Sequence, residues 1–418
     1  MAATMTATTR IGDDRITFAD VTAPLLPDDF LSRYWRREAV LLRAPERDFA
    51  RFCDWNAVNA ILNAGDFAFP AIKVSRRDSP VPSESFTTSI GGRPIVDPRA
   101  VVNLFRDGAS FGITGADSHW PPLRQIVDCF RDALLESVNA NVYCSPANTQ
   151  GFQCHYDLHE VFVLQVEGAK HWRVFQPLTD APVEGWSREA AEEVLQTEPY
   201  VDVVLQKSDV LYVPRGHWHY AVAEDSVSLH VTVGVSCRKG LDFLDWLTGE
   251  LSHDPAWRQN APLLGAAAVG TRTSLAERTA TWATELRESL AERLSDPTLF
   301  DRFLRDTIRG LQPPHAIDLL SQGTPEPVPL DHVVFERPAG RPYVVEQDSS
   351  GAVVVSVAGS DIHLERINAI VVAKIFESQS FTLEQVRAWE PTVDVDELSE
   401  LLTELVRSGL LRTRPMWS

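Results

Sequence analysis

The chain has 418 residues, with a hydrophobic content of 44% and a charged content of 23%, which suits a globular protein of two or three domains. Its formal net charge of −19 disfavours direct binding to nucleic acid, because phosphates would be repelled over much of the surface. The charge is compatible with a basic partner, such as a cationic peptide or an Arg- and Lys-rich protein tail, and equally with an acidic surface that only keeps the protein in solution.

The first segment, residues 1–95, predicts an N-terminal region of mixed, mainly helical structure. Apolar residues at helical spacing predict a helix that runs into a short strand over 26–43, and a second helix over 55–65. The stretch 74–96 is rich in Ser, Pro and Gly and predicts a loop.

The second segment, residues 96–240, begins with two predicted amphipathic helices, over 96–108 and 121–138, and continues as strands. From Asn141 the apolar period becomes that of strands, in short Val-rich runs separated by Gly, Pro or Asp: NVYCSP, HEVFVLQVEG, HWRVFQ, YVDVVLQKSDVLYVP, HWHYAVAE and SVSLHVTVGV. So many short strands in succession predict a sandwich or barrel of the jelly-roll type, whose open mouth suits a cofactor.

Two further segments follow. Residues 241–330 predict helices whose charged and apolar faces suit a bundle or a dimer interface, and they end in the Pro-rich linker TPEPVPL. Residues 331–418 predict a strand pair and then three helices and a short strand, an order that is similar to a winged helix. The last helix, VDVDELSELLTELVRSG, is acidic, so we interpret the tail as a partner-docking module and not as a DNA reader.

Several classes of protein are disfavoured. The five cysteines are scattered and never in CxxC spacing, which disfavours a disulfide framework or a zinc site and favours a reducing cytoplasm. The sequence contains no run of about 18 apolar residues that would predict a membrane span. The sequence contains no GxSxG elbow, P-loop or GxGxxG, and Cys154 beside His155 has no independent activating context.

A His-x-Asp pair is the strongest candidate site. His155 and Asp157 are separated by one residue, so on a strand both side chains point to the same face. The run VFVLQV that follows is continuously apolar, and a charge beside such a core is costly unless it is paired or bound to metal. A histidine from a later strand would complete a two-histidine, one-carboxylate triad for non-haem iron, with positions left open for a chelating co-substrate and dioxygen.

The candidates for the third metal ligand and for a cation in the same cavity lie later in the sequence than Asp157. His217 and His219 both point to the same face of their predicted strand, so periodicity does not show which of them is the third metal ligand. Lys170 follows the His-x-Asp pair by one hairpin and would reach the same cavity, where a dicarboxylate co-substrate needs a cation. His159 and His171 are interpreted as rim residues, and His230 as a residue that orients a ligand.

The runs NVYCSPANTQGFQCHYDLHEVFVLQVEGAKHWRVFQ and DVLYVPRGHWHYA resemble the JmjC-type, cupin-4 group of 2-oxoglutarate oxygenases, specifically the ribosomal oxygenases. The resemblance implies an α+β fold: a double-stranded β-helix (jelly-roll, cupin or JmjC) core over 96–240, a helical dimerisation segment over 241–330 and a C-terminal winged helix over 331–418. It also implies a homodimer.

The resemblance also implies roles for single residues. It makes His155, Asp157 and His219 the ligands of Fe(II), and Lys170 the partner of the far carboxylate of 2-oxoglutarate; Tyr143 and Asn141 fall at positions that line the cavity. It implies an Fe(II)- and 2-oxoglutarate-dependent dioxygenase that uses O2 to hydroxylate an Arg or His side chain of a ribosomal protein. Two alternatives stay open: an oxygenase that tailors a peptide or amino acid in a bacterial biosynthetic pathway, and a non-enzymatic cupin that binds a partner.

Overall fold

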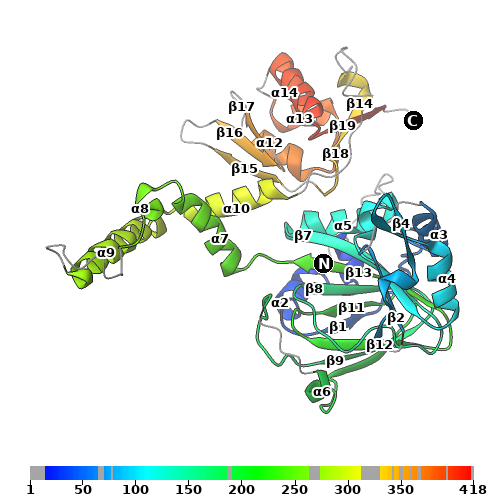
Figure 1. The fold of residues 1–418 in the computed structure, drawn as a ribbon. Helices are drawn as coiled ribbons and strands as arrows, with labels where there is room; N and C mark the ends of the chain where they lie inside the picture. Colours follow the sequence, from blue (N-terminus) through cyan, green and yellow to red (C-terminus); the bar gives the residue numbers. More distant parts are fainter. Residues whose placement is uncertain are drawn as a thin grey trace, which may run out of the picture. The chain divides into compact units, whose positions relative to one another are not determined.

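The structure is a computed structural model. It describes residues 15–64, 70–76, 79–185, 191–262, 274–311, 330–340, 343–347, 352–357, 360–364, 369–391 and 394–415. The chain divides into two compact units, Met1–Cys237 and Arg238–Ser418 (Figure 1). The described part of the chain contains no helix with the length and apolar character needed to cross a membrane.

The helices of the first unit begin where the sequence provides caps. The Asp54 side chain accepts a hydrogen bond from Ala57 N at 2.8 Å, and Asp97 caps the helix that starts at Pro98. The helices predicted within 26–43, 55–65, 96–108 and 121–138 are confirmed. The helices of this unit are α1 (Phe18–Thr22), α2 (Pro27–Arg33), α3 (Trp55–Asn63), α4 (Pro98–Arg106), α5 (Pro121–Leu134) and α6 (Ala191–Val194).

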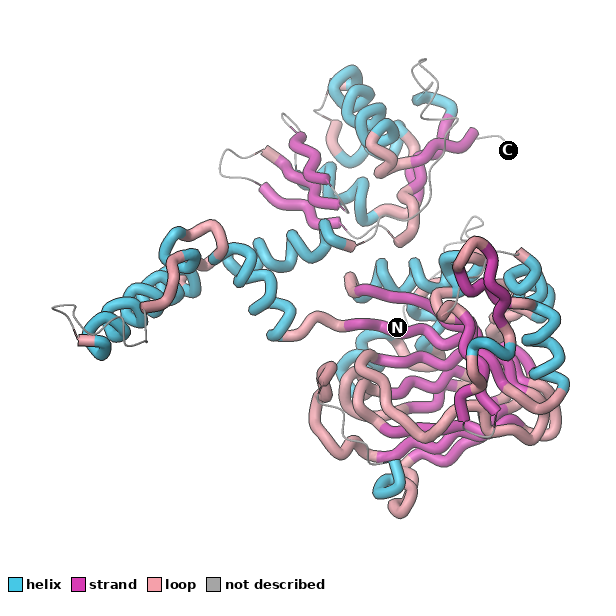
Figure 2. The backbone as a smooth tube through the Cα atoms, viewed as in Figure 1, coloured by secondary structure: helices cyan, strands magenta, loops and turns pink. Residues whose placement is uncertain are grey.

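The large sheet of this unit has eight strands in the order β1-β11-β8-β13-β7-β6-β2-β3, and all its pairings are antiparallel (Figure 2). Strands distant in sequence therefore become neighbours. The strands are β1 (Val40–Leu42), β2 (Ile72–Arg76), β3 (Ser79–Pro80), β6 (Ser110–Ile113), β7 (Ser137–Ser145), β8 (Glu160–Glu167), β11 (Val210–Val213) and β13 (Ser228–Ser236).

A smaller sheet faces the large one. It has the order β10-β9-β12, built from β10 (Val201–Leu205), β9 (Lys170–Phe175) and β12 (Trp218–Ala223). Isolated bridges join β12 to the segment that precedes β8, pairing Gln150 with Val222 and His155 with His219. The two sheets form the expected jelly-roll core, so the prediction of a barrel from short Val-rich strands is confirmed.

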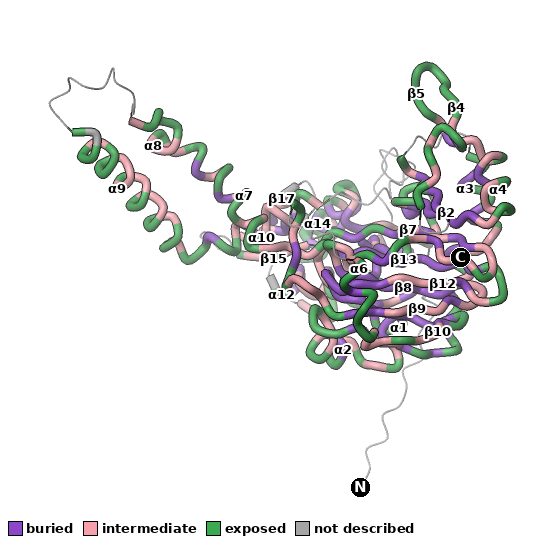
Figure 3. Tube along the Cα trace, turned by 60° about the horizontal axis from the view of Figure 1, so that its bottom comes forward, coloured by how far each residue is buried: buried purple, intermediate pink, exposed green. Residues whose placement is uncertain are grey.

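Alternate residues of β8 pack into two different cores, which explains the continuously apolar run there. Phe162 lies with Phe130 of α5, at a ring-centroid distance of 4.7 Å, and with the aromatic rings of the N-terminal helices. Val161 and Val163 pack instead with Trp172 and other residues of the smaller sheet. Figure 3 shows buried residues along β8 and β13. The helices thus cover one face of the large sheet, and the cavity between the sheets lies at the other.

The stretch predicted as a loop, 74–96, is partly strand. A hairpin forms from β4 (Thr87–Ile90) and β5 (Arg93–Val96), and the short helix η1 (Ser83–Ser85) precedes it. Gly91 and Gly92 take positive φ values of 60° and 80°, which is the conformation that a two-residue hairpin turn requires. The loop prediction was wrong for these residues because the Gly-Gly pair was interpreted as irregular chain.

The second unit begins with helices. These are α7 (Gly240–Leu251), α8 (Pro255–Arg258), α9 (Leu275–Leu294) and α10 (Leu299–Gly310), and α9 is exposed or half-buried along its described residues (Figure 3). A small core of Leu247, Leu251 and Leu299 holds α7 to α10. The Pro-rich linker predicted over 324–330 lies outside the described residues, apart from Leu330.

The end of the chain forms two small sheets and three helices around a separate core. The sheets have the orders β18-β14-β19 and β15-β16-β17, and Phe335 stacks on Phe381 at 5.4 Å inside the core. The elements are η4 (Leu330–His332), β14 (Val333–Glu336), β15 (Tyr343–Gln347), β16 (Val353–Val357), β17 (Ser360–Leu364), α12 (Ala369–Glu377), β18 (Ser380–Phe381), α13 (Leu383–Trp389), α14 (Val395–Arg407) and β19 (Arg412–Pro415).

Candidate metal centre

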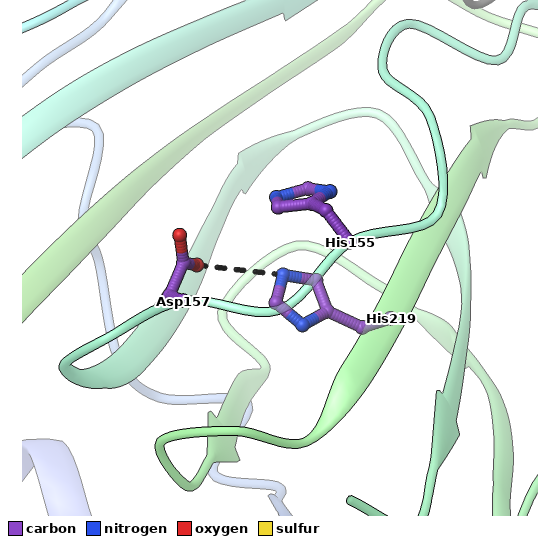
Figure 4. A group of neighbouring side chains, drawn as sticks. All are labelled: His155, Asp157 and His219. Atoms are coloured by element: carbon purple, nitrogen blue, oxygen red, sulfur yellow. Dashed lines mark ion pairs between the residues drawn. The ribbon is translucent and has the colours of Figure 1, made fainter. Parts of the chain in front are cut away.

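Three side chains predicted from the sequence meet in the first unit. His155, Asp157 and His219 each offer one ligand atom, and these atoms lie within 4.8 Å of one another (Figure 4). The His219 Nε2 atom is 3.6 Å from Asp157 Oδ2, and the two imidazole centroids are 4.6 Å apart. Two imidazoles and one carboxylate at these separations can hold a single divalent ion and leave its other positions open.

The hydrogen bonds of the two histidines orient them for a metal. His155 Nδ1 lies 2.7 Å from the carbonyl oxygen of Gln153, and His219 Nδ1 lies 3.0 Å from that of His217. Because a carbonyl oxygen only accepts, each Nδ1 must carry the proton and donate it. Each Nε2 is then left with a free lone pair, which is the tautomer that a metal ligand needs. The residues present therefore fit a metal ion.

The protonation states agree with this assignment. Burial lowers the pKa of His219 to about 4, and the neighbouring His155 adds to the effect, so the imidazole is neutral at pH 7. Burial acts to raise the pKa of Asp157, but its electrostatic interactions with His219 and His155 outweigh burial and hold that pKa below its ordinary value. A neutral imidazole and an ionised carboxylate are the forms that bind divalent metals.

His217, the alternative third ligand, is directed elsewhere. It precedes the first residue of β12, and its Nδ1 is 2.6 Å from the hydroxyl of Tyr200. The same hydroxyl accepts a hydrogen bond from Ala39 N at 3.0 Å. Burial lowers the pKa of His217 to about 4. The described structure brings His219, and not His217, to the other two ligands.

A cavity of about 520 Å³ opens beside the triad. It extends from partly exposed residues of β2 and η1 to the buried end of β9. Its walls are formed by Lys73, Val74, Ser75, Pro80, Val81, Ser83, Phe86, Gly112, Thr114, Tyr143, Phe152, Gln153, His155, Asp157, Val161, Lys170, Trp172, His219, Tyr220, Ala221, His230 and Thr232.

Lys170 is a buried cation at the inner end of this cavity. Its side chain is 3% exposed, and Nζ donates a hydrogen bond to Ser145 Oγ at 3.0 Å. The Ser110 hydroxyl lies 3.0 Å from the same oxygen. Burial lowers the pKa of Lys170 to about 8, so the ammonium is still charged at pH 7. Within the described residues it has no carboxylate within 4 Å, and a buried unpaired ammonium favours an anionic ligand.

The other predicted cavity residues divide into two groups. Tyr143 lines the cavity, and its ring stacks on His230 at 5.1 Å. Asn141 is not among the lining residues, and its Oδ1 accepts a hydrogen bond from Gly115 N at 3.0 Å. His230 also lines the cavity, and its buried Nδ1 has no hydrogen-bond partner in the described structure.

The two rim histidines lie away from the triad atoms. His171 is on the outer side of the small sheet and pairs with Asp202 of β10. His159 packs against the backbone of β13, where a Cβ at Gly234 would lie 2.6 Å from its ring. Sequence reasoning missed Lys73, Trp172 and the Ser110–Ser145 pair. The rarity of lysine, found at only five positions, was the one signal that pointed to Lys73.

Known proteins are similar to this chain in sequence. A JmjC domain model matches residues 119–243. Ribosomal oxygenase 1 of Rattus norvegicus is 32% identical over 247 residues, covering 54% of this chain and 38% of the relative. The bifunctional lysine-specific demethylase and histidyl-hydroxylase NO66 of Drosophila persimilis is 33% identical over 223 residues, covering 52% of this chain and 31% of the relative.

Solved structures extend the likeness in fold. The X-ray structure of E. coli YcfD matches 93% of this chain and 98% of its own, with a TM-score of 0.61 and 18% identity. A YcfD structure in complex with cobalt and 2-oxoglutarate matches the same shares of both chains with a TM-score of 0.56.

The mixed α+β cupin fold, the match over residues 119–243 and the His-Asp-His triad define a JmjC-domain protein. By sequence, the chain is related to the ribosomal oxygenases. It spans between 31% and 38% of the length of the rat and Drosophila relatives.

Proposed function

We propose that this protein is an Fe(II)- and 2-oxoglutarate-dependent dioxygenase that hydroxylates an Arg or His side chain of a ribosomal protein. The observation that carries the proposal is the convergence of His155, Asp157 and His219 at one wall of a cavity that ends in the unpaired Lys170. A metal triad and a distant buried cation in one cavity fit a metal-chelating dicarboxylate.

The chain's own residues would hold the reactants in register. His155, Asp157 and His219 would bind the ferrous ion, which when bound supplies the activation of dioxygen. Lys170 and the Ser145 hydroxyl would bind the far carboxylate of 2-oxoglutarate. The overall reaction places one oxygen atom of O2 in succinate and the other in the new hydroxyl group, with loss of CO2. The apolar walls, including Phe152 and Trp172, would exclude water from the reacting carbon.

The basic ribosomal substrate is supported by two observations. The relatives are named ribosomal oxygenase and histidyl-hydroxylase. The net charge of −19 favours encounter with a cationic protein surface.

The activity is tested by measuring succinate from 2-oxoglutarate, with and without ferrous iron, in the presence of large-subunit ribosomal proteins. We expect iron-dependent succinate and the gain of one oxygen atom by one of these proteins. Absence of iron-dependent succinate would contradict the dioxygenase. Succinate together with oxygen in a small peptide or amino acid, and none in ribosomal proteins, would favour a biosynthetic tailoring enzyme.

We also propose that the helical segment 241–330 forms a homodimer and that 331–418 is a winged helix that docks a partner. Large apolar side chains are exposed on α7 and α10: Leu241, Leu244, Phe300 and Leu304 are between 43% and 58% exposed. Light scattering after size exclusion tests the dimer. A mass of one chain at micromolar concentration would contradict it.

A further inference from the structure

The charged groups of the cavity are unequally distributed. Of its described lining residues, three carry formal charge at neutral pH: Lys73, Asp157 and Lys170. Asp157 belongs to the metal triad, so the described lining of the cavity offers no second carboxylate to an incoming group. We propose that the residue which enters this cavity for hydroxylation has a neutral, hydrogen-bonding side chain, such as an imidazole or an amide. Lys73 then disfavours guanidinium and ammonium groups. The proposal rests on the proposed dioxygenase function and narrows its substrate.

Lys73 lies on the side of the cavity where a substrate would enter. On β2 it alternates with the buried Ile72 and Val74, and its own side chain is exposed. Its register partner on β6 is Gly112, where the Tyr143 ring occupies the space that a side chain would need, 2.8 Å from the position of a Cβ. In the described part of the chain, Lys73 has no carboxylate within 4 Å. Lys170, in contrast, is buried at the other end. The cavity therefore has one cation at its entrance and one at its inner end.

The formal charges explain why an additional cation is unfavourable. With a ferrous ion and 2-oxoglutarate bound, the charges of the ion and Lys170 are balanced by Asp157 and the two co-substrate carboxylates. Lys73 then makes the entrance net positive. A guanidinium or ammonium group would approach this charge and lose water without gaining a carboxylate partner, and burying an unpaired charge is costly.

The remaining polar groups of the cavity suit a neutral side chain. Ser83, Thr114 and Gln153 line it and offer hydroxyl and amide groups. These groups both donate and accept hydrogen bonds, as an imidazole or a carboxamide does. The acidic character of the whole chain does not conflict with this, because it acts on the surface around the target residue. A basic protein segment that presents a neutral residue would suit both the acidic surface of the chain and the positively charged entrance of the cavity.

The test uses the full chain with ferrous iron, 2-oxoglutarate and peptide pools. Each pool has a fixed central residue, His, Asn, Gln, Arg or Lys, between randomised, Lys- and Arg-rich flanks. Oxygen gain at the central residue is measured by tandem mass spectrometry, and succinate is measured in the same samples. Lys73→Glu is compared with Lys207→Glu, which makes the same charge change at an exposed residue outside the cavity lining.

We expect a neutral central residue to gain oxygen at least about tenfold faster than Arg or Lys. Lys73→Glu should reduce this preference severalfold, and Lys207→Glu should leave it unchanged. Faster or equal oxidation of Arg or Lys by the unmodified protein would overturn the proposal, as would equal effects of the two variants. Iron-dependent succinate without oxygen gain in any pool would also overturn the proposed preference for a neutral residue, but it would leave the proposed dioxygenase function standing. Absence of iron-dependent succinate would instead reject the proposed function itself.

Discussion

The backbones of His155 and His219 form a mutual hydrogen-bonded pair. His155 N donates to His219 O at 3.1 Å, and His219 N donates to His155 O at 2.7 Å. This isolated bridge holds two residues 64 positions apart at the same level of the fold. The relative position of these two metal ligands is thus set by the main chain. Asp157 lies two residues after His155, in the irregular segment that precedes β8.

Because the backbone sets this geometry, we predict that Asp157→Ala removes iron binding without unfolding the protein. Affinity for ferrous iron should fall by more than about 100-fold. The thermal midpoint of the metal-free protein should be preserved. Calorimetric titration under anaerobic conditions measures the affinity. Asp225→Ala, at an exposed turn residue, is the matched control, and retained iron binding in Asp157→Ala would remove this residue from the triad.

Lys170→Ala should chiefly weaken the binding of 2-oxoglutarate. A hydrogen bond to a charged group contributes about 1.5–3 kcal/mol, so the KM for 2-oxoglutarate should rise by roughly 10- to 100-fold. Iron affinity should change little, because Lys170 is not among the three clustered ligands. Lys207→Ala serves as the control. An unchanged KM in Lys170→Ala would show that another group holds the far carboxylate.

The two neighbouring histidines should respond differently to substitution. His219→Ala should abolish iron binding, whereas His217→Ala should retain it. The latter removes the hydrogen bond with Tyr200 inside the protein and should lower the free energy of unfolding by about 1–3 kcal/mol. Iron titration and urea denaturation of both variants separate the roles. Loss of iron binding in His217→Ala with a native fold would reverse the assignment.

The metal-free protein should lose stability as the pH falls from about 6.5 to about 4. Burial lowers the pKa of His217 and His219 to about 4 in the folded protein, below the usual value of about 6.5. In this window the unfolded chain binds more protons, so protonation favours unfolding. Urea denaturation at several pH values measures the slope. His217→Gln should flatten it, and equal slopes for the two proteins would mean that His217 does not contribute to the loss.

Local patterns were sufficient for two of the metal ligands and insufficient for the third ligand and for the cavity. The pair His155 and Asp157 could be predicted because the two residues are separated by one position. The strand predicted for them was wrong, since they lie in an irregular segment that ends before β8 begins at Glu160. Lys73 and Ser145 could not be placed, because their positions depend on pairings between strands far apart in sequence. Lys73 lies on β2, which pairs with β6, and Ser145 lies on β7, which pairs with β6 and β13. The choice of His219 over His217 likewise depends on where β12 begins, which periodicity leaves undetermined.

A crystal structure with manganese and 2-oxoglutarate, solved without oxygen, is the decisive measurement for the metal centre. We predict one ion bound by His155 Nε2, Asp157 and His219 Nε2, at about 2.0–2.3 Å. The far carboxylate of 2-oxoglutarate should lie beside Lys170 Nζ. An ion bound elsewhere, or one that lacks any of these three ligands, would contradict the assignment of the triad.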